Sequence, residues 1–292
     1  MQNTKHNFGG QWTEEKLRRV KKYLVAYATI MNKQQFRFAF IDAFAGTGYR
    51  ILPDEQNGSQ LAMPELLEDD TRTFVEGSAK IALDVRPRFS NYIFIERDAK
   101  KIVELEKLRN SYPELSKDVF IVNKDANEWL QDRCRNYTWK KGRAVLFLDP
   151  YGMQVSWSTI EAIAETKAID LWILFPLGVA VNRLLRRDAQ ISPAIRKRLN
   201  FIFGSPDWYQ AFYQKKRKED LFGENEATIK DCSFDSIAEY FVNRLLSIFP
   251  GVAPKPLALR NSKNIPLYLL CFAAANVKGA KTAIKIAQEI LN

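Results

Sequence analysis

The sequence predicts an α/β protein built on a mostly parallel β-sheet, and three observations support this prediction. Short, strongly apolar runs recur along the chain, and charged amphipathic segments separate most of them. The apolar runs are continuous, which is typical of parallel strands buried on both faces. Acidic or glycine-containing segments directly follow several of the runs. Because ligands of open α/β sheets bind at the carboxyl ends of the strands, a ligand site is expected at that edge.

Seven strands and several helices are expected. The strands cover residues 36–41, 92–95, 119–122, 144–148, 170–175, 257–259 and 267–273. The helices cover residues 13–31, 77–83, about 98–110, about 126–136, 156–167 and 280–291. Thr13 is the expected N-cap of the first helix, because Glu14 and Glu15 would follow it in the first turn. Residues 50–75 are polar and irregular, and they are expected to be a loop or an inserted subdomain.

Two parts of the chain are distinguished by their patterns. The alternation of strands and helices runs through residues 1–178 and resumes over 251–292, and these segments are expected to form one core. Residues 179–250 break the rhythm with several successive helical patterns and are expected to be a helical insertion. A length of 292 residues suits one domain that carries an insertion. Because the insertion follows the fifth strand on the ligand side, it is expected to recognise a substrate or partner.

The chain is basic, with 44 Lys and Arg against 34 Asp and Glu and a formal charge of +10. Such a balance favours a polyanionic partner, usually nucleic acid, either RNA or DNA. One cluster lies on the first helix, and it comprises Lys16, Arg18, Arg19, Lys21 and Lys22. A second cluster, Arg183, Arg186 and Arg187, supplies the candidate substrate-binding residues. A third, Lys215–Lys218, follows Trp208, Tyr209, Phe212 and Tyr213, for which core packing is the favoured role.

Several classes of site are disfavoured by composition. Cys134, Cys232 and Cys271 are far apart, so neither a disulfide framework nor a zinc site is expected. His6 is the single histidine, which argues against histidine-based acid–base chemistry and against a metal. No apolar run approaches the roughly 18 to 20 residues that a membrane span needs. The N-terminus lacks a signal-peptide core, so a cytoplasmic protein without membrane contact is expected.

Four strand ends carry the residues that indicate a cofactor. The first strand leads into Asp42-Ala43-Phe44-Ala45-Gly46-Thr47-Gly48, where glycines let the backbone approach a ligand closely. Glu96 follows the second strand, where a carboxylate can accept hydrogen bonds from ribose hydroxyls. Asp125 follows the third strand and is placed to meet an adenine amino group, although an acid there is often a helix cap. Asp149-Pro150-Tyr151-Gly152 follows the fourth strand.

The nature of the ligand is indicated by what these motifs lack. A dinucleotide site would contain G-x-G-x-x-G, with an acid about 20 residues further on. Here the third glycine is absent, Glu96 lies much further along the chain, and no P-loop lysine follows. Asp42 beside the glycines also disfavours a pyrophosphate. A ligand with a cationic reactive end and an amino group fits better, and S-adenosylmethionine is such a ligand.

At these strand ends the sequence resembles the class I methyltransferases. Asp42–Gly48 is similar to their first motif, Glu96 to their second, Asp125 to their third and Asp149–Gly152 to their fourth. The resemblance implies a Rossmann-like fold with a mostly parallel seven-stranded sheet, helices on both faces and S-adenosyl-L-methionine as cofactor. The cofactor-binding residues that it implies are Asp42, Phe44, Ala45, Gly46, Gly48, Ser78, Glu96, Arg97, Asp125 and Ala126.

Two closer resemblances exist. The large-subunit ribosomal RNA adenine-N6 methyltransferases share the D-x-x-A-G-x-G turn, and Gly77-Ser78-Ala79 and Asp149–Met153 are similar to their later motifs. The three-Cys-motif partner proteins are similar over nearly the whole chain. The segments that carry this similarity are Trp12–Leu17, Tyr23-Leu24, Phe40–Gly46, Phe94–Glu96, Leu148–Gly152, Phe175–Gly178 and Asn182–Leu185. This second resemblance implies a separate partner protein that carries the three cysteines.

The fourth motif carries the implied chemistry. In amino-methyltransferases it reads [DNS]-P-P-[YFW], where the carboxylate and a backbone carbonyl accept hydrogen bonds from an exocyclic NH₂ and the aromatic ring stacks on the base. Asp149, Pro150 and Tyr151 are therefore the implied catalytic residues. Here tyrosine replaces the second proline and Gly152 replaces the aromatic residue, which puts the stacking role in doubt.

Alternatives for the activity stay open. The D-P-Y-G form is also similar to a motif of transfer RNA guanine-N2 methyltransferases, so adenine N6 and guanine N2 are both candidate acceptors. The altered fourth motif also favours a second hypothesis, a non-catalytic or weakly active nucleic-acid-binding partner subunit. A protein or small-molecule methyltransferase is a third hypothesis, which the basic charge disfavours.

Overall fold

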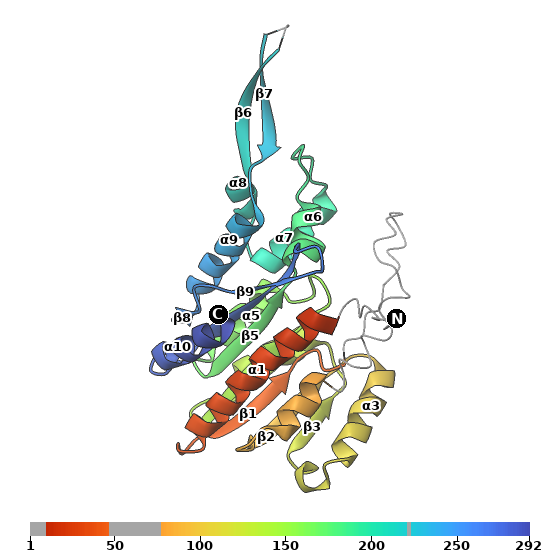
Figure 1. Ribbon diagram of the computed structural model, residues 1–292, viewed down its shortest axis with the longest axis vertical. Helices are drawn as coiled ribbons and strands as arrows, with labels where there is room; N and C mark the ends of the chain where they lie inside the picture. The colour runs from red at the N-terminus through yellow and green to blue at the C-terminus, as the bar shows by residue number, and fades with distance from the viewer. Residues whose placement is uncertain (1–9, 47–76, 221–222) are drawn as a thin grey trace, which may run out of the picture.

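The computed structural model describes residues 10–46, 77–220 and 223–292, and a central β-sheet organises them (Figure 1). Within this part of the chain the sheet has the order β3-β2-β1-β4-β5-β10-β8, and β9 also pairs with β10. The parallel strands are β1 (Arg37–Asp42), β2 (Asn91–Ile95), β3 (Val119–Val122), β4 (Gly142–Leu148) and β5 (Ile169–Phe175). The antiparallel partners at the far side are β10 (Pro266–Ala274), β8 (Gly251–Val252) and β9 (Leu257–Arg260).

The strand order places a topological switch point between β1 and β4. From β1 the chain winds outward through β2 and β3, and then it returns to β4 on the other side of β1. In the register of the sheet, the last residue of β1, Asp42, pairs with Phe94 on β2 and with Phe147 on β4. Ligands of doubly wound sheets bind at such a point, outside the carboxyl ends of the strands.

Helices cover both faces of the sheet because successive strand residues point to opposite sides. On β1, Phe38 and Phe40 join one buried cluster, whereas Ile41 joins the other. The first cluster is covered by α1 (Gly10–Met31), the helical residues 77–84, α3 (Ala99–Asn110) and α10 (Ala280–Leu291). The second is covered by α4 (Ala126–Asn136), α5 (Trp157–Glu165) and helices of the insertion. The predicted α/β fold, with a mostly parallel sheet and helices on both faces, is confirmed.

The insertion after β5 contains more than helices. Its helical elements are η3 (Leu177–Val181), α6 (Asn182–Leu184), α7 (Pro193–Phe203), α8 (Trp208–Phe212) and α9 (Phe234–Leu246). Between α8 and α9, β6 (Tyr213–Asp220) and β7 (Gly223–Lys230) form an antiparallel hairpin that projects from the body (Figure 1). The insertion is mostly helical, as expected, and the hairpin is the part that the expectation did not include. Both strands are mostly polar, so neither carries the alternating apolar pattern by which a strand is recognised in sequence.

Two element boundaries also differ from the expectation. The first helix begins at Gly10, so Thr13 lies inside its first turn and is not the N-cap. The edge of the sheet includes β8, which has two residues and no sequence signal of its own. Pro254 and Pro256 separate β8 from β9, because proline cannot donate to a strand ladder. His6, Gly48 and the whole of the irregular segment 50–75 lie outside the described residues.

No helix in the described part of the chain has both the length and the apolar character needed to cross a lipid bilayer.

Candidate functional site

The carboxyl ends of β1 and β4 bring together three buried charged side chains. Asp42 ends β1 and is 1% exposed, and Asp149 follows β4 and is 6% exposed. Lys16 comes from α1, is 1% exposed, and donates a hydrogen bond from Nζ to Asp149 Oδ2 at 2.5 Å. The partners of this ion pair lie 133 positions apart in sequence, so it ties the N-terminal helix to the switch point.

Lys16 was expected on a basic surface, and its burial corrects that expectation. Residues four and eight positions further along α1, Val20 and Leu24, are buried in the core beneath the helix. Because side chains at i and i+4 share a helix face, Lys16 is on the same face as these residues. The spacing of Lys16 from Val20 and Leu24 in the sequence indicated that Lys16 would be buried. The expectation of a basic surface instead followed the charge of the neighbouring residues.

Asp42 is held by its own turn and lies beside Ser78. The backbone N–H of Phe44 donates to Asp42 Oδ1 at 3.2 Å. Asp42 Oδ2 and Ser78 Oγ are both buried, and neither makes a hydrogen bond of full geometry with the described residues, although the Ser78 hydroxyl lies close enough to lower the pKa of Asp42. Burial raises the pKa of Asp42 to about 7, and the nearby Asp149 carboxylate adds to the rise. The Ser78 hydroxyl and the Lys16 ammonium lower the same pKa and only partly offset the effect of burial.

Because the pKa of Asp42 is raised, the free energy of unfolding should depend on pH. Asp42→Asn should remove this contribution to the pH dependence. An unfolded aspartate releases its proton near pH 4, whereas folded Asp42 holds its proton until about pH 7. The folded state therefore binds more protons between these values, so this contribution to stability falls as pH rises through the window, by as much as ~1.4 kcal/mol per pH unit. Urea unfolding of the ligand-free protein between pH 5 and 8 should show a steeper fall than Asp42→Asn shows. Parallel curves for the two proteins would contradict the assignment.

Glu96 lies directly after β2 with one oxygen engaged and the other without a partner. The backbone N–H of Asp98 donates to Glu96 Oε1 at 2.7 Å. Glu96 Oε2 is buried with no hydrogen-bond partner in the described chain, and burial raises the pKa of this carboxyl. Gly46 faces the same carboxylate, because a Cβ built on it would lie 3.5 Å from Glu96 Oε2. Its φ of +98° favours glycine, so the turn after β1 is built for close approach.

The remaining predicted cofactor residues differ in burial and in their hydrogen bonds. Asp125 is the N-cap of α4, and its Oδ1 accepts from the backbone N–H groups of Asn127 and Glu128. The helix-cap role that the sequence left open is thus present. Ala126 begins α4 and is buried, as are Phe44 and Ala45. Arg97 is exposed, and its carbonyl accepts a hydrogen bond from Asn123 Nδ2 at 3.0 Å.

The fourth motif forms a turn over the end of β4. Burial raises the pKa of Asp149, while the adjacent Lys16 ammonium lowers it. Pro150 is buried and Tyr151 is half-buried. The backbone N–H of Tyr151 donates to Gln154 Oε1 at 3.0 Å, and Gly152 takes a φ of +64°. A Cβ on Gly152 would meet nothing within 4 Å, so the space beside this position is open.

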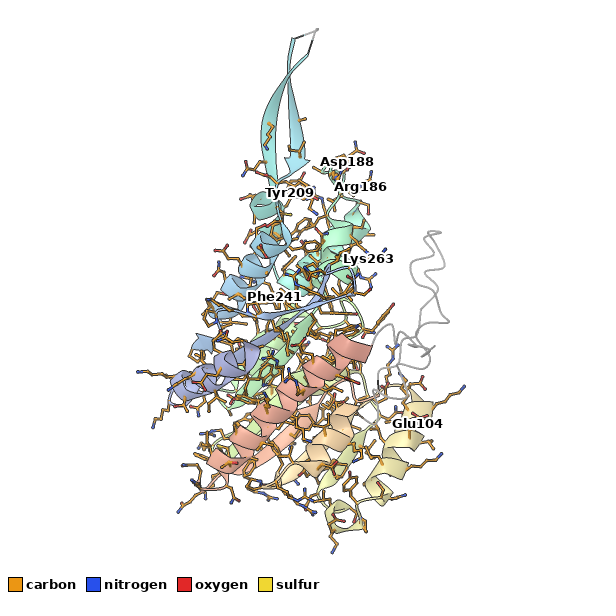
Figure 2. All side chains as sticks on the ribbon, viewed as in Figure 1. Glu104, Arg186, Asp188, Tyr209, Phe241 and Lys263 are labelled. Atoms are coloured by element: carbon orange, nitrogen blue, oxygen red, sulfur yellow. The ribbon has the colours of Figure 1, made fainter. Side chains whose placement is uncertain are left out.

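The candidate substrate-binding arginines lie in the insertion near the base of the hairpin. Arg183, Arg186 and Arg187 are exposed. Arg186 donates two hydrogen bonds to Asp188, at 3.0 Å from Nε and 2.7 Å from Nη2, so its planar edge is already engaged (Figure 2). Arg183 and Arg187 therefore remain the better candidates for phosphate contact. The aromatic residues nearby are packed as expected, and Trp208, Phe212 and Tyr213 are buried.

The charged residues and the unpartnered oxygens fit an S-adenosylmethionine site. Asp42 Oδ2, Ser78 Oγ and Glu96 Oε2 are buried polar atoms with no hydrogen-bond partner in the described chain. Such atoms are costly unless a ligand or water satisfies them. Carboxylate acceptors suit hydroxyl, amino and cationic groups, which this cofactor carries. Among the described residues, no group of histidine, cysteine, aspartate and glutamate is arranged to hold a metal.

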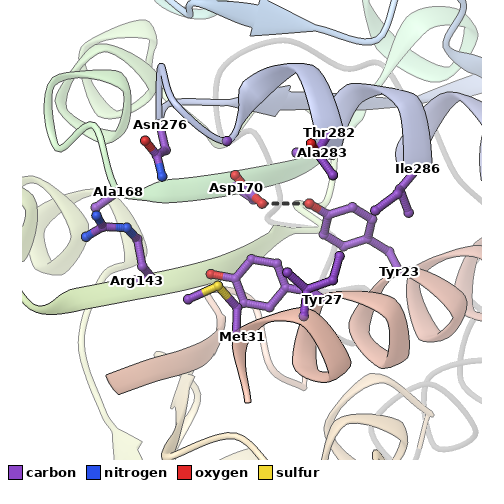
Figure 3. Close-up of a pocket in the computed structure, with 12 residues that line it drawn as sticks. Tyr23, Tyr27, Met31, Arg143, Ala168, Asp170, Asn276, Thr282, Ala283 and Ile286 are labelled. Atoms are coloured by element: carbon purple, nitrogen blue, oxygen red, sulfur yellow. Dashed lines mark hydrogen bonds between the residues drawn. The ribbon is translucent and has the colours of Figure 1, made fainter. Parts of the chain in front are cut away.

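A separate cavity of about 190 Å³ lies at the opposite edge of the sheet, between α1 and α10 (Figure 3). Its lining includes Asp170, whose Oδ2 accepts a hydrogen bond from the Tyr23 hydroxyl at 2.6 Å. Burial raises the pKa of Asp170 to about 6. This cavity is near the amino ends of β4 and β5, so it is distinct from the cluster at the switch point.

Comparisons with known proteins find distant structural similarity. No protein-family model matches the sequence, and a search of curated proteins finds no match. A solved structure from Listeria monocytogenes, titled "putative S-adenosylmethionine dependent methyltransferase", is 10% identical, covers 88% of this chain and 97% of its own, and gives a TM-score of 0.40. Legionella pneumophila LPL1258 is 14% identical over 82% of this chain and 93% of its own, with a TM-score of 0.39. "Putative methyltransferase yhhF" from Escherichia coli is 11% identical over 73% and 87%, with a TM-score of 0.29. The assignment of the fold rests on the strand order and register of the sheet.

Proposed function

We propose that the protein is an S-adenosylmethionine-dependent methyltransferase that N-methylates an exocyclic base amine, adenine N6 or guanine N2, in RNA or DNA. One observation carries the proposal most directly. Unpartnered, buried acceptor oxygens lie at the ends of β1 and β2, where an open α/β sheet binds its ligand. The basic charge supports a nucleic acid as substrate.

The proposed roles follow from the geometry. Asp42, Ser78 and Glu96 would hold the cofactor. S-adenosylmethionine supplies an electrophilic methyl group when it is bound. Asp149 would accept a hydrogen bond from the acceptor amine, which would keep the nitrogen lone pair directed at the site of transfer. Its pKa is raised by burial, so this carboxylate is also suited to take the proton that the methylated amine loses.

Two observations favour a second candidate function. Asp149 already accepts a hydrogen bond from Lys16, and Gly152 replaces the aromatic residue of the related motifs. A carboxylate that is engaged in this way suits a non-catalytic or weakly active subunit that binds nucleic acid and keeps the methyltransferase-like fold. The sequence resemblance to three-Cys-motif partner proteins adds a separate protein as a proposed partner.

Labelled-methyl transfer distinguishes the two functions. The protein is incubated with S-adenosylmethionine carrying a labelled methyl group and with total RNA or total DNA, and the modified site is then located by sequencing. The proposed enzyme should transfer label to a defined base. Salt-dependent nucleic-acid binding without transfer, by a protein that binds S-adenosylmethionine, would instead support the subunit.

A further inference from the structure

The first turns of α1 bring an aromatic ring to the neighbourhood of Asp149. The Nζ atom of Lys16 lies over the Trp12 ring, 5.2 Å from its centroid, and 2.5 Å from Asp149 Oδ2. One ammonium group thus contacts both the carboxylate and the ring. The centroid of the Trp12 ring therefore lies no further from Asp149 Oδ2 than the sum of these two distances.

Trp12 is fixed in place by the sheet. Its ring stacks on Tyr268 of β10, with centroids 5.2 Å apart and an angle of 25° between the planes. Tyr268 is buried, whereas Trp12 is half-buried at the rim of the same core cluster. The indole is supported by Tyr268 and carries the Lys16 ammonium over its ring, so it becomes a rigid stacking surface for a planar base once that ammonium moves aside.

Asp149 and Trp12 together offer the two contacts that a planar aromatic amine needs. The carboxylate accepts hydrogen bonds from an amino group, and the ring provides a stacking surface. Lys16 now makes both kinds of contact with its ammonium group, as a cation over an aromatic ring and as a hydrogen-bond donor. It therefore marks the place where an acceptor amine would lie.

The geometry points to Trp12 as the base-stacking residue of the methyl-acceptor site, supplied by α1 in place of the aromatic residue that Gly152 replaces in the fourth motif. This inference rests on the proposed function. It names the acceptor as a planar nitrogenous base whose amino group takes the position of the Lys16 ammonium, so the buried Lys16–Asp149 ion pair has to open when the base binds. It also explains how a D-P-Y-G motif can serve a base without a stacking ring at its fourth position.

The test compares two substitutions of Trp12, one that keeps an aromatic ring and one that does not. Trp12→Phe keeps an aromatic face, whereas Trp12→Leu keeps an apolar contact with Tyr268 and removes the face. Binding of fluorescently labelled single-stranded oligoadenylate is measured at low salt with the full chain. Because base stacking is tolerant of sequence, this probe serves whether the natural acceptor is adenine or guanine. Trp12→Phe should bind within about threefold of the unaltered protein, and Trp12→Leu should bind about tenfold or more weakly.

Equal binding by Trp12→Phe and Trp12→Leu would overturn the inference, and so would absence of oligoadenylate binding by the unaltered protein. Thermal unfolding of both variants checks that each is folded. Calorimetry with S-adenosylmethionine is performed on the same samples. Failure to bind this cofactor counts against the proposed function, whereas the comparison of the two variants decides the role of Trp12 separately.

Discussion

Substituting Lys16 by methionine should lower the free energy of unfolding by about 3–5 kcal/mol. Lys16 and Asp149 are both almost fully buried, and their hydrogen bond is 2.5 Å long. Removing the ammonium leaves a buried carboxylate without its cationic partner, and this costs more than the loss of one surface ion pair. It also removes a cation that lowers the pKa of Asp42. Urea unfolding at pH 8 measures the effect where the carboxylates carry most charge.

A matched control and a double variant make this measurement specific. Lys22 lies on an exposed part of the same helix, so Lys22→Met should change stability by no more than about 0.5 kcal/mol. Lys16→Met combined with Asp149→Leu removes both charges and should recover much of the loss, because an apolar pair tolerates burial. Additive losses in the double variant would show that the two side chains do not act as a pair.

Asp149→Ala should reduce labelled-methyl transfer by on the order of a hundredfold to a thousandfold, the range seen when one positioned transition-state hydrogen bond is lost. The affinity for S-adenosylmethionine should stay within about threefold, because Asp42, Ser78 and Glu96 supply the unpartnered acceptors. Asp149→Asn retains an acceptor oxygen and should keep measurable transfer. Transfer at the original rate by Asp149→Ala would show that Asp149 is not the residue that positions the amine.

The core of the fold could be predicted from the sequence because its signals are local. The continuous apolar runs of β4 and β5 indicate buried parallel strands, and Asp98 and Asp125 cap the helices that follow β2 and β3. The hairpin β6–β7 could not be predicted in the same way. Its strands are mostly polar, so they lack the periodic contrast that distinguishes a strand from a helix.

The candidate site was predictable only in part, since it depends on contacts between distant segments. Acidic residues at strand ends, such as Asp42 and Glu96, can be recognised in the sequence because they directly follow apolar runs. The pairing of Lys16 with Asp149 spans 133 positions and is set by the packing of α1 against the sheet. The contact between Trp12 and Tyr268 is likewise tertiary. Lys16 and Trp12 were therefore missed as site residues, although the register of Lys16 with Val20 and Leu24 indicated its burial.

The central claim is that the ends of β1 and β2 form an S-adenosylmethionine site, and calorimetry tests it most directly. The unaltered protein should bind the cofactor at one site. Glu96→Gln keeps the volume of the side chain but removes the charge of Glu96 Oε2, so it should weaken binding roughly tenfold or more. Glu104→Gln, on the exposed side of α3, should bind as the unaltered protein does (Figure 2). No binding by the unaltered protein, or equal affinity after Glu96→Gln, would contradict the account.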